Sequence, residues 1–75
     1  MENNYRTKDL AESSFLLAKG KQLLSIERQG KVCWFVYENK IECEELVNEF
    51  LFGNSTISAK TFYEAIQTLK HKIFS

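Results

Sequence analysis

The sequence predicts a small α+β domain, in which three helices pack on a small antiparallel sheet built around one β-hairpin. Three observations lead to this class. Bulky apolar residues crowd both sides of a single glycine turn within residues 21–38, as in a hairpin. Three other stretches repeat apolar residues at helical spacing behind capping residues. The chain has 75 residues, no proline and no linker or repeat, so we expect one domain over residues 1–75.

The first helix is expected at about residues 9–19, after a polar segment, residues 1–6, that we expect to be disordered. Either Thr7 or Asp9 can cap this helix. Asp9 and Glu12 have the spacing of a capping box, and Gly20 suits the left-handed position that ends a helix. Helical periodicity puts six residues on the inner side: Leu10, Ala11, Ser14, Phe15, Leu17 and Ala18. It puts Glu12, Leu16 and Lys19 on the outer side.

The turn of the hairpin can be closed in two ways. A two-residue turn at Gln29-Gly30 pairs Arg28 with Lys31, two like charges, and forces Gln29 into positive φ. A three-residue loop of Arg28, Gln29 and Gly30 needs positive φ only at the glycine, and it pairs Glu27 with Lys31. We therefore expect the three-residue loop.

This register gives the hairpin two unequal faces. The continuously apolar face, which we expect the helices to cover, holds Leu24, Ile26, Val32, Trp34 and Val36. The mixed face holds Leu23, Ser25, Glu27, Lys31, Cys33, Phe35 and Tyr37. A two-stranded ribbon cannot hide this much apolar surface alone, so other parts of the chain or a partner must cover it. Whether anything covers the mixed face is left open by the sequence.

Two further helices complete the prediction. Asn39 is expected to cap a helix that ends at Gly53, with an apolar stripe of Cys43, Leu46, Val47, Phe50 and Leu51. Ser58 is expected to cap a helix over about residues 59–73, with a stripe of Phe62, Ala65, Ile66, Leu69 and Ile73. Thr56-Ile57-Ser58 forms either a short third strand or an extended segment that leads into the last helix. The expected order is helix, hairpin, helix, optional strand, helix, with the first and third helices on the apolar hairpin face.

Charge and composition indicate a cytoplasmic protein without membrane association. Ten acidic and ten basic residues cancel, so no global field draws the molecule to nucleic acid or anionic membranes. Residues 41–53 nevertheless carry four glutamates and no base, which we interpret as a solvated helix face: Glu42, Glu44, Glu45 and Glu49. The sequence shows no secretory signal and no apolar stretch long enough for a membrane span.

No catalytic, cofactor or metal site is expected, and we predict that the protein is not an enzyme. A nucleophilic cysteine needs a base within reach, but Cys33 lies in a strand and Cys43 on the apolar stripe of a helix. His71 is expected to face solvent. The two cysteines have no zinc or redox spacing, so we expect free thiols.

Binding surfaces are more plausible, and the mixed hairpin face supplies the candidates. Leu23, Phe35 and Tyr37 form a candidate partner surface, unless a helix covers them and makes Phe35 part of the core. Trp34, on the apolar face, is either core or the anchor of a partner. For nucleic acid, the candidate contacts around the hairpin are Lys19, Lys21, Arg28, Lys31 and Lys40.

Four blocks combine caps, turns and core residues in a recognisable order. They are Thr7, Asp9 and Leu10 leading to Phe15, Leu16 and Gly20; Cys33-Trp34-Phe35-Val36; Leu46-Val47, Phe50 and Gly53; and Phe62-Tyr63, Ala65, Leu69 and Lys70. Across about residues 5–74, the chain resembles a family of small domains of unknown function found in prokaryotes and their phages or plasmids. The resemblance implies a free-standing small domain in such a setting, and it brings no catalytic or binding residue with it.

The bulky apolar residues outnumber what three helices and a ribbon can cover. We therefore expect a non-enzymatic interaction module that self-associates as a homodimer, through exposed hairpin or third-helix surface. One alternative is a small nucleic-acid-binding accessory protein of a prokaryote or mobile element. Another is a phage or plasmid factor that docks on a host protein through the acidic second helix.

Overall fold

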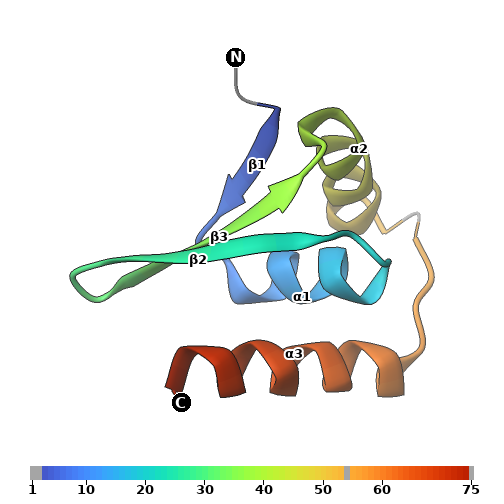
Figure 1. Cartoon of the computed structure of the whole chain (residues 1–75). Coiled ribbons are helices and arrows are strands. Elements are labelled where there is room, and N and C mark those ends of the chain that lie inside the picture. The colour runs from blue at the N-terminus through green and yellow to red at the C-terminus, as the bar shows by residue number, and fades with distance from the viewer. Residues whose placement is uncertain (1–2, 54, 75) are drawn as a thin grey trace.

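The computed structural model describes residues 3–53 and 55–74 as three helices and a three-stranded antiparallel sheet (Figure 1). In chain order the elements are β1 (Asn4–Thr7), α1 (Leu10–Ala18), β2 (Leu23–Gln29), β3 (Val32–Glu38), α2 (Lys40–Leu51) and α3 (Ala59–Phe74). The predicted α+β class with a hairpin is confirmed. The predicted element order is not, because a strand precedes the first helix. Within the described part of the chain, no helix has both the length and the apolar character needed to cross a membrane.

The N-terminal strand is the element that the sequence analysis missed. Residues 4–7, expected to be mostly disordered, pair with β3 from Asn4 opposite Glu38 to Thr7 opposite Phe35, and residues 1–2 lie outside the described residues. The sheet order is β1-β3-β2, so β3 is the central strand. Thr56–Ser58, the other candidate for a third strand, is irregular. A polar segment can form β1 because an edge strand is held by its backbone ladder to the central strand.

The predicted three-residue loop of the hairpin is wrong. Gln29 pairs with Val32, which leaves Gly30 and Lys31 as a two-residue turn. Gly30 has a φ of +63°, whereas Lys31 is not among the described residues with positive φ. A two-residue turn of type II′ needs positive φ only at its first central residue. Gly30 therefore meets the steric requirement of the turn without a third loop residue.

The helices cover the face of the sheet opposite to the one predicted. The helices do not cover the predicted face, where Leu24 and Val32 are exposed and Trp34 is half-buried, although Val36 on that face is buried. Instead they cover the face of Phe35 and Tyr37, both buried. The structure thus shows the alternative in which a helix covers the mixed face and Phe35 belongs to the core.

A bulge in β2 adjusts the inner face further. Leu23 pairs with Tyr37 and Ile26 pairs with Phe35, with a register shift between Leu23 and Ser25. Because side chains alternate along a strand, Leu23 and Ile26 would otherwise point to opposite faces. The extra residue brings both side chains to the core. Ile26, predicted beside Trp34, therefore lies on the opposite face of the sheet.

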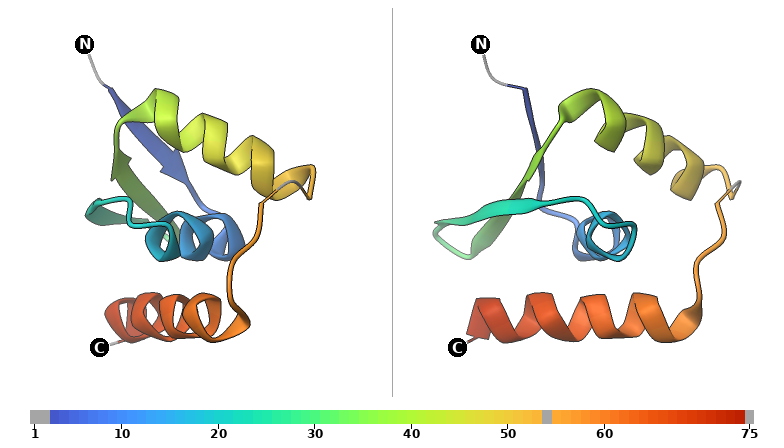
Figure 2. Two further views of the ribbon diagram at one scale, coloured as in Figure 1. Left: turned by 90° about the vertical axis from the view of Figure 1, so that its right-hand side faces the viewer. Right: turned by 45° about the vertical axis from the view of Figure 1, so that its right-hand side comes forward.

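Helix α1 is the centre of the molecule. Both views of Figure 2 show it between α3 on one side and the sheet with α2 on the other. Four consecutive residues of α1 are therefore buried: Ser13, Ser14, Phe15 and Leu16. The prediction that Leu16 lies on an outer face is wrong, because α1 has partners on both sides. The prediction that α3 packs on the sheet is also wrong, because α3 packs mainly on α1.

The core joins all three helices to the sheet. Its buried cluster consists of Leu16, Phe35, Tyr37, Cys43, Val47 and Leu69. Phe15 of α1 stacks on Phe50 of α2, with ring centroids 4.7 Å apart. The predicted inner residues of α2 and α3 are thus confirmed, with the exception of Leu51, which is exposed.

The predicted helix caps are confirmed. The side chains of Asp9, Asn39 and Ser58 each accept a hydrogen bond from a backbone N–H three residues later. The donors are Glu12 at 3.1 Å, Glu42 at 3.2 Å and Thr61 at 3.0 Å. At the end of α1, Gly20 has a φ of +89° and donates its N–H to the Leu17 carbonyl, as in a Schellman motif.

Candidate binding site at the hairpin end

The outer face of the sheet presents the only tryptophan of the chain between two cations. The Arg6 guanidinium carbon lies 5.0 Å from the centre of a Trp34 ring, and the Lys8 ammonium lies 5.8 Å from it. Arg6 also forms an ion pair with Glu27, at 2.8 Å. The exposed surface around Trp34 is thus both aromatic and cationic, a combination that attracts π systems and anions.

A groove lies beside this face, between the hairpin end and the C-terminal part of α3. We call it the hairpin groove; its cavity volume is about 320 Å³, and it is lined by Lys8, Leu10, Arg28, Lys31, Cys33, Phe35, Lys70, Ile73 and Phe74. Four of these residues are cationic, and no described acidic residue lines the cavity. The other five are apolar, so the groove has an apolar floor and a basic rim.

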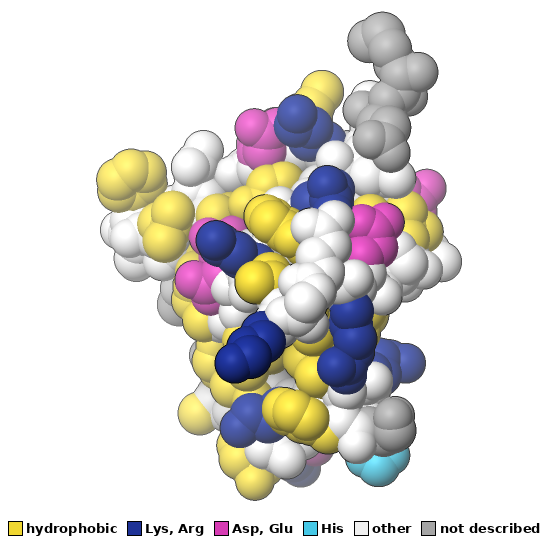
Figure 3. Space-filling model, turned by 90° about the vertical axis from the view of Figure 1, so that its left-hand side faces the viewer, with side chains coloured by type: hydrophobic (Ala, Val, Ile, Leu, Met, Phe, Trp, Pro, Cys, Tyr) yellow, Lys and Arg dark blue, Asp and Glu magenta, His cyan; other side chains and the backbone are white. Residues whose placement is uncertain are grey.

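The folding of three separate segments creates this groove. Lys8 follows β1, the turn of the hairpin carries Lys31, and Lys70 lies near the end of α3. Arg28 ties two of the segments together by donating a hydrogen bond to the backbone carbonyl of Ile73. Figure 3, which views the molecule from the hairpin end, shows basic side chains around the projecting turn with apolar side chains between them.

The five predicted nucleic-acid contacts do not form one surface. Arg28 and Lys31 line the hairpin groove. Lys19 and Lys21 line a different hollow, together with the carboxylates of Glu42, Glu45 and Glu49. Lys40 lies at the start of α2, in a third hollow. Only two of the five residues therefore contribute to a common basic site.

Lys21, predicted to contact nucleic acid, is instead paired with a carboxylate of α2. Lys21 donates a hydrogen bond to Glu42, and this contact lowers the pKa of the Glu42 carboxyl and raises the pKa of the Lys21 ammonium. Lys19 donates to the backbone carbonyl of Thr56 at 3.1 Å and lies 5.6 Å from the centre of the Phe15 ring. These two lysines thus connect α1 and its following loop to neighbouring segments.

The candidate partner surface of Leu23, Phe35 and Tyr37 faces inward. Phe35 and Tyr37 are buried, and Leu23 is half-buried against the core. The Tyr37 hydroxyl donates to the Ser13 carbonyl at 2.7 Å, and burial raises the pKa of this phenol to about 12. The surface offered to a partner by the sheet is therefore the opposite face, which carries Trp34.

The thiols and the histidine do not converge. Cys43 is buried, its Sγ lies 3.4 Å from the Glu38 carbonyl oxygen, and burial raises the pKa of its thiol. A raised pKa keeps the thiol protonated and makes it a poor nucleophile. His71 is exposed on α3, as predicted, in a shallow hollow with Gln67. The described residues contain no group of three or more His, Cys, Asp or Glu side chains able to hold a metal ion.

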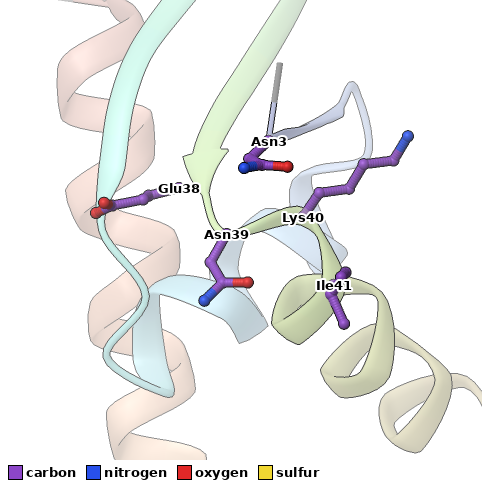
Figure 4. Close-up of a pocket in the computed structure, with 5 residues that line it drawn as sticks. All are labelled: Asn3, Glu38, Asn39, Lys40 and Ile41. Carbon is purple, nitrogen blue, oxygen red and sulfur yellow. The ribbon is translucent and has the colours of Figure 1, made fainter. Parts of the chain in front are cut away.

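A further hollow of about 270 Å³ lies where β3 turns into α2 (Figure 4). It is lined by Asn3, Glu38, Asn39, Lys40 and Ile41. Figure 4 shows the charged ends of Glu38 and Lys40 pointing in opposite directions. Asn39 is already engaged as the cap of α2, with a φ of +67°. This hollow therefore lacks the convergent polar groups that a small-molecule site needs.

A family model described as a domain of unknown function, DUF5659, matches residues 2–75. The chain belongs to the DUF5659 family. The match includes all six elements and every residue of the hairpin groove, and it confirms the predicted resemblance to a family of domains of unknown function. No curated protein and no solved structure matches this DUF5659 chain. Its function must therefore be argued from its surfaces.

The sequence analysis did not identify Lys8 and Lys70 as residues of the hairpin groove, or Arg6 as the cation over Trp34. Arg6 and Lys8 were unplaced because the segment before α1 was not recognised as a strand beside β3. Lys70 lies near the C-terminal end of a helix, where a cation also suits the helix dipole, so its position alone does not indicate a basic site. The one available signal was Arg6-Thr7-Lys8, in which two cations alternate with a smaller residue, as on one face of an edge strand.

Proposed function

We propose that this DUF5659 protein is a non-enzymatic interaction module that self-associates, with a homodimer as its smallest assembly. The observation that carries the proposal is the apolar surface that the fold leaves exposed. Five large apolar side chains are each at least 60% exposed: Ile41, Leu51, Phe52, Tyr63 and Phe74. Isolated exposed apolar residues are ordinary, but groups of them on one surface indicate interaction sites.

Three of these side chains come from one element. Ile41 and Phe52 are eleven residues apart, about three helical turns, and so project from the same side of α2. Leu51 is adjacent to Phe52. The inner side of α2 is already formed by Cys43 and Val47, which are buried. Helix α2 thus carries exposed apolar side chains near both ends of its outer side, with glutamates between them, and the described chain does not cover them.

Sedimentation equilibrium over a range of micromolar concentrations tests this proposal. The expected result is a reversible increase in mass above the monomer, weakened by Phe52→Ser. The matched control is Lys60→Ser, which changes an exposed residue of α3 outside the apolar set. A chain that stays strictly monomeric at every concentration contradicts the proposal.

A second candidate function is nucleic-acid binding, favoured by the basic hairpin groove beside Trp34. Single-stranded nucleic acid is bound by cations that track phosphates and by aromatic rings on which bases stack. Fluorescence anisotropy of a labelled oligonucleotide should then show binding that weakens steeply with salt, because phosphate contacts release counterions. Lys31→Ala should weaken it and Lys60→Ala should not. The absence of binding even at low salt would remove this candidate.

The proposal includes a cytoplasmic location in a prokaryote or one of its phages or plasmids. The setting is supported by the family resemblance that the caps, turns and core residues carry. The location is supported by Cys33 and Cys43, which are free thiols, as is usual for proteins of a reducing compartment.

A further inference from the structure

We infer that the hairpin groove receives the acidic outer side of α2 from a second copy of this chain. This inference rests on the proposed self-association and names the two surfaces that meet.

The groove defines what its occupant must offer. Its rim holds four cations, Lys8, Arg28, Lys31 and Lys70, without a described acidic residue among them. Uncompensated cations at the edge of an apolar cavity favour an anionic occupant, because the low-dielectric walls strengthen the field. The apolar floor, which includes Phe74, favours an occupant that also carries apolar side chains. The occupant should therefore place carboxylates beside exposed apolar groups.

The outer side of α2 carries this combination. Glu44, Glu45 and Glu49 are exposed and form no ion pair with the described residues, while Glu45 and Glu49 also line a hollow that contains Lys19 and Lys21. Ile41 and Phe52 are exposed on the same side of the helix. Residues 41–53 contain no basic residue. An amphipathic helix that lies in an apolar groove with complementary charges is a common mode of protein recognition.

The arrangement of the two surfaces requires a second copy. Figure 1 shows the hairpin end and α2 on opposite sides of the molecule, so a chain cannot place its own α2 in its own groove. The equal numbers of acidic and basic residues leave copies without net repulsion. When the groove of one copy binds α2 of a second copy, α2 of the first copy and the groove of the second copy stay free. Such a heterologous contact extends the assembly beyond a dimer, into a closed ring or an open filament.

Two charge-reversed variants test the inference. The groove variant combines Lys31→Glu with Lys70→Glu, and the helix variant combines Glu45→Lys with Glu49→Lys. All four side chains are exposed, so both variants should fold, which circular dichroism verifies. Each variant alone loses the charge complementarity, because its two reversed side chains meet like charges and balance the unchanged ones beside them. We expect its self-association to be at least about tenfold weaker than that of the unmodified chain. Higher salt should weaken self-association of the unmodified chain as well.

Mixing the two variants decides the question. In the mixture, the basic groove of the helix variant meets the acidic α2 of the groove variant, and the reversed pair also matches. Sedimentation should therefore show association restored in the mixture but in neither variant alone. The control, Lys60→Glu with Glu64→Lys on α3 outside the groove, should associate like the unmodified chain.

The outcomes separate the two proposals. If the unmodified chain associates and the variants do so equally well, or if mixing restores nothing, the groove contact is wrong while self-association stands. If the unmodified chain is monomeric at every concentration and salt, both proposals are wrong. If it is monomeric and the groove variant alone loses oligonucleotide binding, the groove is a nucleic-acid site instead.

Discussion

The Tyr37 hydroxyl on β3 donates a 2.7 Å hydrogen bond to the backbone carbonyl of Ser13 on α1, and the Ser13 hydroxyl lies 2.8 Å from the same phenolic oxygen. Both residues are fully buried. Because the phenolic proton is directed to the carbonyl, the Ser13 hydroxyl is the donor in the second bond. This pair joins the central strand to the central helix through polar groups that have no access to water, so each depends on the other.

Ser13→Ala and Ser14→Ala should have opposite effects on stability. Both serines are fully buried on α1, but the Ser14 hydroxyl oxygen has no hydrogen-bond partner in the described part of the chain. Removing Ser13 should lower the free energy of unfolding by about 1 kcal/mol, because Tyr37 loses a donor. Removing the unpartnered Ser14 hydroxyl should be neutral or stabilising by up to about 1 kcal/mol. Midpoints of urea unfolding measure both changes, and equal destabilisation would contradict the assignment.

Stability should fall at alkaline pH. Burial raises the pKa of Tyr37 from 10.0 to about 12, and burial together with the Glu12 hydrogen bond also raises the pKa of Tyr5. The folded state thus holds these protons more tightly than the unfolded state. Its stabilisation is complete below pH 10 and is lost as the pH rises towards 12. For Tyr37 the loss should be roughly 2–3 kcal/mol.

Urea unfolding at a series of pH values measures this alkaline loss. Tyr37→Phe should reduce it, because the variant has no phenol to ionise at that position. Tyr63→Phe is the control: it removes an exposed phenol and should leave the loss unchanged. A free energy of unfolding that stays constant between pH 10 and 12 would be inconsistent with the burial of Tyr37.

Gly30→Ala should destabilise the hairpin without a steric clash. A Cβ added to Gly30 meets no atom within 4 Å, so the cost comes only from the positive φ of +63°. A residue with an L side chain should lose about 1–2 kcal/mol there. D-alanine at the same position, introduced by chemical synthesis, accepts positive φ and should be at least as stable as glycine. Thermal unfolding of the two chains should therefore rank D-alanine above L-alanine.

Local signals in the sequence predicted the helices well. Asp9, Asn39 and Ser58 cap the helices as expected, because a cap depends on a side chain and a backbone N–H only three residues away. The hairpin register was harder to predict. Both the loop that was preferred and the turn that was rejected ended at Gly30, whereas the structure begins the turn there. A glycine permits positive φ, but its presence does not show whether it is the first or the last residue of the turn.

Tertiary contacts explain the remaining errors. Leu16 belongs to the core because the side of α1 that periodicity assigned to solvent is covered as well: Glu12 on that side accepts hydrogen bonds from Tyr5 and Thr7 of β1. The hairpin groove was not predictable either, since Lys8, Lys31 and Lys70 come from three elements whose proximity depends on β1 pairing with β3. Only Arg28 and Lys31, which lie on either side of Gly30 at the hairpin end, were recognised from the sequence.

Leu69→Ala should cost far more stability than Phe74→Ala, although the second change removes the larger side chain. Both residues lie on α3, but Leu69 is fully buried in the core cluster with Leu16, and Phe74 is 80% exposed. Truncating a buried leucine removes apolar contacts and leaves a cavity, at a cost of about 2–5 kcal/mol. Truncating an exposed phenylalanine should cost less than about 0.5 kcal/mol.

The location of this loss can be measured as well. Helix α3 packs mainly on α1, so a cavity at Leu69 should weaken α3 before it weakens the sheet. Hydrogen exchange should then show a greater loss of amide protection in residues 59–74 than in β3, whose residues pair with strands on both sides. The measurement should be made at low micromolar concentration, so that self-association through Phe74 does not contribute. Equal costs for the two variants would mean that α3 is held by its C-terminal end instead of by Leu69.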